Sequence, residues 1–138
     1  MALWGVSAER QIHYAETRPI PVHVKPRSLP LRTDCSGFAT LCYLWAGATD
    51  PNRSHYSGAG FTGTLLQHGR HIPVRKCQPG DLIVYGPAPG HHVVIVVEAG
   101  SDPLCVSHGS EAGPLTIRHS AEQAGQPQPA TGLRFRVL

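Results

Sequence analysis

The amino-acid sequence predicts an α+β fold in which one main helix packs on an antiparallel β-sheet of about five strands. Apolar residues follow a helical period in the first half of the chain, whereas β-branched runs separated by turn residues fill the second half. The 138 residues are 41% hydrophobic and 15% charged. This length and composition predict a single globular domain over residues 1–138 with one hydrophobic core.

The first half is predicted to hold a short helix, an extended segment and then the clearest helix of the chain. Residues 1–13 are amphipathic, and four prolines between positions 19 and 30 favour extended chain or loop over residues 14–33. Helical spacing then aligns four apolar residues on one face: Phe38, Leu41, Cys42 and Trp45. Thr33 and Asp34 are favourable N-cap residues and Gly47 is a natural end, so the helix begins beside Cys35.

The second half is predicted to be mainly strands. Residues 47–63 are rich in turn formers and form a long loop, with a short helix near 64–68. The β-branched runs at 81–86, 91–100 and 104–109 are separated by short turns and predict an antiparallel meander. Two more strands are expected at 115–119 and 133–138, joined by a flexible surface loop.

The charge pattern argues against a nucleic-acid-binding protein. Twelve Lys and Arg residues and nine Asp and Glu residues give a formal net charge of +3, and no window holds a dense basic run. A mild positive charge favours approach to an anionic polymer such as a cell wall. The N-terminal residues lack the pattern of a signal peptide or membrane anchor, so we expect a protein that stays in a cytoplasm, inserts into no membrane and keeps its four cysteines as thiols.

Cys35 is the candidate nucleophile. Backbone N–H groups and the positive end of the helix dipole favour an anion at a helix N-terminus, where a thiol is more readily ionised. The N–H groups of Cys35 and Ser36 can also face the oxyanion formed when a carbonyl is attacked, and Gly37 lets a substrate approach closely. An ordinary buried cysteine is the alternative, and it is the reading we favour for Cys42 inside the helix.

His92 is the candidate general base because it opens the strongest strand, just after a Pro–Gly turn. The tight turn around residues 99–103 predicts an antiparallel register in which the numbers of paired residues sum to 200 or 202. Either register places His108 on the same face as His92, where it can hold the imidazole in its working tautomer. His91 is a rival base on the opposite face. Glu111 and Ser107 are alternatives to His108 as the third residue.

A metal site is the other chemical interpretation of a chain rich in Cys and His, but no zinc-binding spacing such as C-x-x-C or H-E-x-x-H occurs. Glycine-rich phosphate motifs are also absent, because "HYSGAGFTG" has no Lys where a P-loop requires one. We therefore expect neither a metal nor another cofactor.

Three blocks of sequence together resemble the NlpC-type papain-like cell-wall peptidases. The blocks are "TDCSGF" at the start of a helix, "PGDL" opening a strand and a histidine beginning the next strand. They occur here in the family's order, over roughly residues 33–109. The segment "AGATDPNRSHYSGAGFTGTLL" is similar to the linker in phage-encoded members, although Val94 stands where the family often has glycine.

The resemblance implies a papain-like fold with Cys35 as nucleophile, His92 as base and His108 as the orienting residue. It suggests Tyr14 as a group near the oxyanion, with a core tyrosine as the alternative, and a structural role for Asp34. It implies hydrolysis of an amide bond in peptidoglycan stem peptides, commonly between D-glutamate and diaminopimelate. Substrate-binding residues are expected in the 14–33 and 47–63 segments.

The absence of a signal peptide is typical of a phage endolysin that waits in the host cytoplasm and reaches the wall through holin lesions. The chain is then either a complete lysin or the catalytic piece of a larger one. An N-acetylmuramoyl-L-alanine amidase or another acyl-transfer enzyme on the same fold, and an inactive wall-binding or virion module, are the alternatives.

Overall fold

The computed structural model describes residues 12–23, 31–109 and 114–135, and its centre is an antiparallel sheet of six described strands. The strands lie in the order β3-β8-β4-β5-β6-β7. Their bounds are Arg70–Ile72 (β3), Leu82–Tyr85 (β4), His92–Glu98 (β5), Leu104–Ser107 (β6), Leu115–Arg118 (β7) and Ala130–Arg134 (β8). From β4 to β7, strands consecutive in sequence are neighbours in the sheet, as the predicted meander requires.

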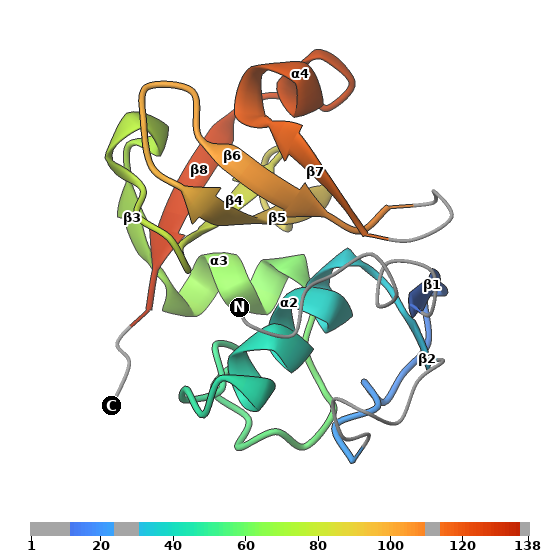
Figure 1. The fold of residues 1–138 in the computed structure, drawn as a ribbon. Coiled ribbons are helices and arrows are strands. Elements are labelled where there is room, and N and C mark those ends of the chain that lie inside the picture. Colours follow the sequence, from blue (N-terminus) through green and yellow to red (C-terminus); the bar gives the residue numbers. More distant parts are fainter. Residues whose placement is uncertain (1–11, 24–30, 110–113, 136–138) are drawn as a thin grey trace.

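Helices cover both faces of this sheet (Figure 1). The helices α2 (Cys35–Trp45) and α3 (Thr62–His68) lie on one face, and the short helix α4 (His119–Ala124) lies on the other. A 3₁₀ turn, η1 (Val74–Lys76), joins β3 to the segment that leads into β4. The layered arrangement buries side chains on both faces of the central strands, and all four residues of β4 are buried.

Two apolar clusters result from the alternation of side chains along the strands. The cluster between the sheet and α2 includes Leu41, Leu82, Val93 and Ile95. The cluster on the opposite face contains the alternate residues of the same strands together with Cys105: Ile83, Tyr85, Val94 and Val96. Each of these side chains is no more than 2% exposed, so the sheet forms the rigid base on which the rest of the structure is built.

A small second sheet leads the chain into α2. The strands β1 (Ile12–Tyr14) and β2 (Leu31–Thr33) pair in parallel, with Tyr14 opposite Thr33. Asp34 follows β2 directly and caps α2, so the end of this two-stranded sheet fixes where the helix begins. Cys35 is consequently held between a strand and a helix rather than in a loop.

Most predicted elements are confirmed, and the differences have identifiable causes. The helix at Cys35 and the strands β4 to β7 lie where expected, whereas the last strand begins earlier, at Ala130. The expected helix at residues 1–13 lies outside the described residues except for its last two positions, which belong to β1. The strand β3 and the 3₁₀ turn η1 were not predicted. The flexible loop expected after residue 119 is wrong, because residues 119–124 form α4.

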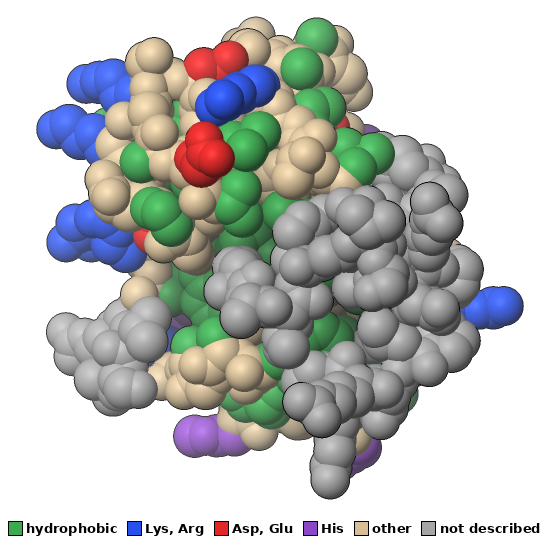
Figure 2. Space-filling view, in the orientation of Figure 1, with side chains coloured by type: hydrophobic (Ala, Val, Ile, Leu, Met, Phe, Trp, Pro, Cys, Tyr) green, Lys and Arg blue, Asp and Glu red, His purple; other side chains and the backbone are tan. Residues whose placement is uncertain are grey.

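The surface at the β3 edge of the sheet is basic. Figure 2 shows Lys and Arg side chains along this edge, where β3 and η1 carry the exposed residues Arg70, Arg75 and Lys76. Arg134, which pairs with Arg70 across β3 and β8, has its charge offset by Asp81 at 2.8 Å. Among the described residues, no helix has the length and apolar character needed to cross a membrane.

Candidate active site

The start of α2 places Cys35 next to a tightly built cap. One carboxylate oxygen of Asp34, Oδ1, accepts hydrogen bonds from the backbone N–H of Gly37 at 2.8 Å and from the Ser36 hydroxyl at 3.2 Å. A side-chain cap of this kind satisfies backbone donors that have no partner within the helix. Gly37 is required here, because a Cβ at this position would collide with Oγ1 of Thr33. Asp34 and Gly37 therefore have structural roles, and Cys35 is partly exposed beside them.

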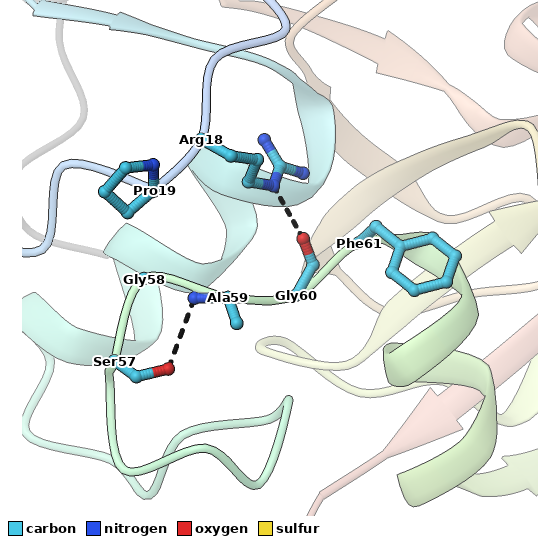
Figure 3. Close-up of a pocket in the computed structure, with 7 residues that line it drawn as sticks. All are labelled: Arg18, Pro19, Ser57, Gly58, Ala59, Gly60 and Phe61. Atoms are coloured by element: carbon cyan, nitrogen blue, oxygen red, sulfur yellow. Dashed lines mark hydrogen bonds between the residues drawn. The ribbon is translucent and has the colours of Figure 1, made fainter.

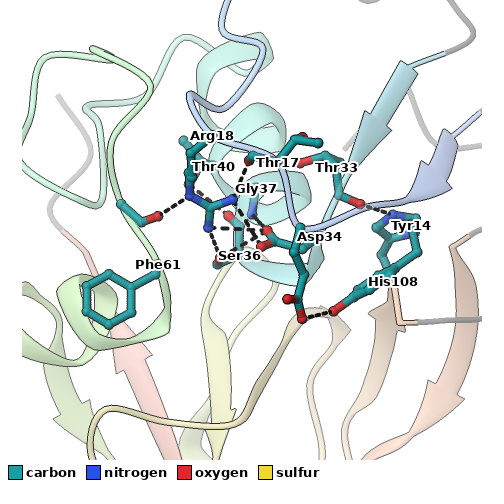
Figure 4. Close-up of polar contacts among 12 residues, drawn as sticks. Tyr14, Thr17, Arg18, Thr33, Asp34, Ser36, Gly37, Thr40, Phe61 and His108 are labelled. Carbon is teal, nitrogen blue, oxygen red and sulfur yellow. Dashed lines mark hydrogen bonds and ion pairs between the residues drawn. The ribbon is translucent and has the colours of Figure 1, made fainter.

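Arg18 connects this cap to residue 17 and to the loop that contains Gly60 (Figure 4). Its guanidinium forms an ion pair with Asp34 at 3.0 Å and donates to the Ser36 hydroxyl at 3.1 Å. It also donates to the backbone oxygens of Thr17 at 2.7 Å and Gly60 at 2.8 Å. The planar guanidinium thus joins the chain before β2, the start of α2 and the loop that precedes α3.

His92 is the first residue of β5, and its side chain contacts that of Cys35. Its side chain is only 8% exposed. Burial lowers the pKa of His92, but hydrogen bonding with the Cys35 and Glu122 side chains and the charges of both groups outweigh it, and together they raise the pKa to about 9. The sequence prediction that His92 and Cys35 come together is confirmed. His91 is exposed and lies before the strand begins.

The predicted pairing of His92 with His108 through an even register is wrong. The residue numbers of the paired residues Glu98 and Leu104 sum to 202. A β-bulge between Val96 and Glu98 shifts the register by one residue, so that the numbers of the remaining pairs sum to 201. Val94 therefore lies opposite Ser107, and alternation places His92 on the face of Ser107, with His108 on the face of Val93. The Nε2 atom of His108 is bonded to the Thr33 carbonyl oxygen at 2.8 Å, and its ring contacts those of Tyr14 and Phe38.

The shifted register brings Ser107 to His92 instead, and Glu122 reaches His92 from α4. Nε2 of His92 lies 2.9 Å from the Ser107 hydroxyl, and it is 3.8 Å from Oε2 of Glu122, an ion-pair distance. Hydrogen bonding from His92 and then from Ser107 lowers the pKa of Glu122, against the opposing effect of burial. Ser107 is one of the two residues that the sequence analysis named as alternatives to His108. Glu122 was missed because it belongs to the predicted loop, and the other alternative, Glu111, lies outside the described residues.

Tyr14 lies close enough to Cys35 for the charge of Cys35 to act on its phenol. Its hydroxyl donates to Glu16 at 2.9 Å, and its ring is 5.9 Å from that of His108. Burial raises the pKa of Tyr14, as do the hydrogen bond to Glu16 and the nearby charges of Cys35 and Asp34. The phenol therefore stays protonated, and its single hydroxyl proton is donated to Glu16.

A hollow of about 650 Å³ opens beside the cap of α2 (Figure 3). Arg18 and Pro19 form one wall, and the loop of residues 57–61 forms the other. Phe61 is 48% exposed, which is unusual among the large apolar side chains that the structure describes. These walls come from the two segments in which substrate-binding residues were expected.

The thiols of the other three cysteines have raised pKa values. Burial raises the pKa of Cys42 to about 12, of Cys77 to about 11 and of Cys105 to about 12, so these thiols are protonated at neutral pH. All four cysteines are free thiols. In the part of the chain that the structure describes, no group of three or more His, Cys, Asp or Glu side chains is arranged to hold a metal ion.

Comparison with known proteins gives one consistent result. The model of the NlpC/P60 family matches residues 21–126. The peptidoglycan endopeptidase RipB of two Mycobacterium tuberculosis strains is 33% identical over 84 residues, which are 61% of this chain and 30% of RipB. The chain thus matches less than a third of the length of these curated relatives. The solved structure of the peptidoglycan hydrolase RipB from Mycobacterium tuberculosis has a similar fold, with a TM-score of 0.53 and 24% identity, and the match covers 79% of this chain and 47% of that one.

Proposed function

The chain belongs to the NlpC/P60 family, and from this premise we propose that it is a cysteine peptidase that hydrolyses an amide bond in the stem peptides of peptidoglycan. One observation carries the proposal: Cys35, at the capped start of α2, contacts His92, and His92 carries a raised pKa. The relative RipB is a peptidoglycan endopeptidase, and this supports the substrate class.

The proposed reaction starts from the resting pair in which the Cys35 thiol proton has already passed to His92. Since Nε2 of His92 faces Ser107 and Glu122, Nδ1 remains to receive this proton. The Cys35 thiolate then attacks the amide carbonyl carbon, a C–S bond forms, and the carbonyl oxygen takes the electron pair. Backbone N–H groups at the start of α2 stabilise this oxyanion, with the Tyr14 phenol close by.

The second half of the reaction restores the enzyme. The oxyanion collapses, and the C–N bond breaks as His92 gives its proton to the leaving amine. Water then attacks the thioester while His92 accepts a proton from it, and the C–S bond breaks to release a carboxylic acid and to restore the Cys35 thiolate beside protonated His92. His92 acts first as acid and then as base, which requires an imidazole held in one orientation.

We propose the bond between D-glutamate and diaminopimelate as the one that is cut, and the hollow beside Arg18 as a substrate subsite. The hollow adjoins the cap of Cys35 through the contacts of Arg18 with Asp34 and Ser36. The exposed ring of Phe61 supplies an apolar surface on which part of a stem peptide can rest.

The first test is mass spectrometry of diaminopimelate-type peptidoglycan digested with the wild-type protein, with Cys35→Ser and with Cys42→Ser. Cys42→Ser is the matched control, because it makes the same substitution further along α2, away from the capped end. We expect cleaved stem peptides from the wild type and the control and none from Cys35→Ser. Thermal unfolding of each variant checks that loss of cleavage is not loss of the fold.

Other products would assign other functions. Intact stem peptides released from the glycan would identify an amidase on the same fold. Saturable binding to peptidoglycan without products would identify an inactive binding or virion module. Full cleavage by Cys35→Ser would exclude the thiol mechanism.

Action as a phage endolysin, released to the wall through holin lesions, is the cellular part of the proposal. The similarity of residues 46–66 to the linker of phage-encoded members supports it. Expression inside a bacterium with and without a holin tests it: we expect lysis only with the holin. Lysis without one would require another route to the wall.

A further inference from the structure

Helix α4 is a six-residue element fixed to the rest of the protein at two points. At its start, the Asp102 carboxylate in the β5–β6 turn accepts hydrogen bonds from the Ser120 backbone N–H at 2.8 Å and from the Ser120 hydroxyl at 2.6 Å. Next to it, Nδ1 of His119 lies 2.7 Å from the Tyr85 hydroxyl, and the two rings are stacked at an angle of 14°. So short a helix holds its position through these contacts rather than through its own hydrogen bonds.

From this fixed helix, Glu122 reaches the imidazole of His92. Glu122 is 9% exposed, and its charge is compensated by the ion pair with His92, by Ser107 and by Nε2 of Gln126, which donates to Oε1 at 3.4 Å. A buried carboxylate is costly unless it is paired in this way. Among these partners, Glu122 reaches the imidazole at its Nε2 atom, which lies 3.8 Å from Oε2.

We propose that Ser107 and Glu122 are the positioning residues of this active site, and that they hold the His92 imidazole with Nε2 protonated and Nδ1 facing Cys35. Ser107 accepts the Nε2–H hydrogen bond and directs its own hydroxyl proton toward the Glu122 carboxylate. The negative charge of Glu122 stabilises the imidazolium that forms when Cys35 loses its proton. The proposal rests on the proposed function in one respect, the role of His92 as acid and base.

The geometry favours this pair over His108. His108 lies on the opposite face of the sheet from His92, and its Nε2 is committed to the Thr33 carbonyl at the end of β2. Its ring packs against Phe38 of α2 and Tyr14 of β1. These contacts tie the large sheet to the two-stranded sheet, which is a structural role.

The test compares Glu122→Gln and Ser107→Ala with the wild type. Glu98→Gln is the matched control, because it makes the same change at an exposed position on the far end of β5, the strand that carries His92. The first measurement is the rate at which iodoacetamide alkylates Cys35 as a function of pH, which requires no peptidoglycan. The charged and titratable groups that face His92 are Cys35 from α2, Tyr85 from β4 and Glu122 from α4, with His119 behind Tyr85.

The alkylation rate changes at high pH, where the His92 imidazolium loses its proton. We expect Glu122→Gln to lower the midpoint of this change by about one pH unit, because the imidazolium loses its carboxylate partner. Ser107→Ala should move it in the same direction, and Glu98→Gln should leave it unchanged. In peptidoglycan cleavage, kcat of Glu122→Gln should fall about tenfold or more, with KM nearly unchanged, since the substrate does not touch Glu122. Glu122→Asp, which keeps the charge, should recover part of the shift.

The outcomes separate the two proposals. If the wild type cleaves no peptidoglycan, the proposed function fails, while the alkylation profile still decides the role of Glu122. An alkylation profile of Glu122→Gln identical to that of Glu98→Gln would overturn the role of Glu122. So would a larger shift from His108→Gln than from Glu122→Gln, since that would assign the positioning role to His108. Near-ultraviolet circular dichroism of each variant identifies any that lose the fold, and for those Glu122→Asp supplies the comparison.

Discussion

At the scale of single residues, His92 carries a charge that its surroundings both oppose and support. Its burial disfavours the imidazolium, whereas Cys35 and Glu122 favour it, and the balance raises the pKa to about 9. The ring remains positive at neutral pH as a result. An imidazolium beside a cysteine is the resting form that a thiol peptidase needs, because it keeps an acid ready for the leaving amine.

The raised pKa of His92 predicts how stability varies with pH. The folded-state pKa lies above the ordinary value of 6.5, so the stabilising contribution is complete below pH 6.5 and is lost as pH rises through about 9. Over this interval we expect the wild type to lose up to about 3 kcal/mol more of its unfolding free energy than His92→Gln does. Urea denaturation at pH 6.5 and pH 9.5 measures the difference. An equal loss in both proteins would contradict the prediction.

Gly37 predicts a second effect at the residue scale. In Gly37→Ala the new Cβ meets Oγ1 of Thr33, so α2 must move away from the end of β2. We expect a loss of about 1–3 kcal/mol in unfolding free energy and slower alkylation of Cys35. Gly125→Ala is the control, because a Cβ there has only the Glu122 backbone oxygen near it, at 3.9 Å. Equal stability of the two variants would show that the cap tolerates a side chain.

At the scale of elements, α4 depends on a residue from another part of the chain. Asp102 bonds Ser120 from the turn that joins β5 to β6, so the helix is stabilised by a contact between two connections of the sheet. The hydroxyl of Tyr85 provides the second support from β4. The position of Glu122 is therefore set by one strand and one turn.

Removal of the first support predicts local unfolding. In Asp102→Ala the start of α4 loses two hydrogen bonds, and we expect faster amide hydrogen exchange over residues 120–125, with exchange in β4 and β5 unchanged. Alkylation of Cys35 should then shift in the same direction as in Glu122→Gln. Glu98→Ala, an exposed acidic residue at the end of β5, serves as the comparison. Unchanged exchange over α4 would mean that the Tyr85 contact alone is sufficient.

The sequence predicted α2 and the central strands because their signals are local. The Asp34 cap and the i, i+3, i+4 spacing after Cys35 lie within one segment, as do the β-branched residues of β4 and β5. The helix α4 could not be predicted, because its stability comes from Asp102 and Tyr85. The register of β5 and β6 failed for a similar reason: a single bulged residue near the turn moves His108 to the other face, and no pattern in the sequence marks it.

At the scale of the whole molecule, Arg18 connects three segments that are distant in sequence. It joins residue 17, the start of α2 and the 57–61 loop, and its side chain is 34% exposed. Partial exposure means that solvent screens the ion pair with Asp34, so its contribution to stability is modest. Its main effect is on geometry, because it links the 57–61 loop that lines the hollow to the cap of α2.

Loss of Arg18 therefore predicts a change in substrate binding. We expect Arg18→Gln to raise KM for stem peptides several-fold, with a smaller fall in kcat, and to lower unfolding free energy by less than about 1 kcal/mol. Arg75→Gln, an exposed residue on η1, controls for the loss of one positive charge on the approach to an anionic wall. A fall in kcat with unchanged KM would instead place Arg18 in support of the nucleophile.

The raised pKa values of Cys42, Cys77 and Cys105 have a practical consequence for measuring this protein. Their protonated thiols leave Cys35 as the thiol expected to react with a mild electrophile at neutral pH. One equivalent of label per folded molecule then counts the competent sites in a preparation, before any substrate is known. Rates divided by that count can be compared between preparations that contain different fractions of folded protein.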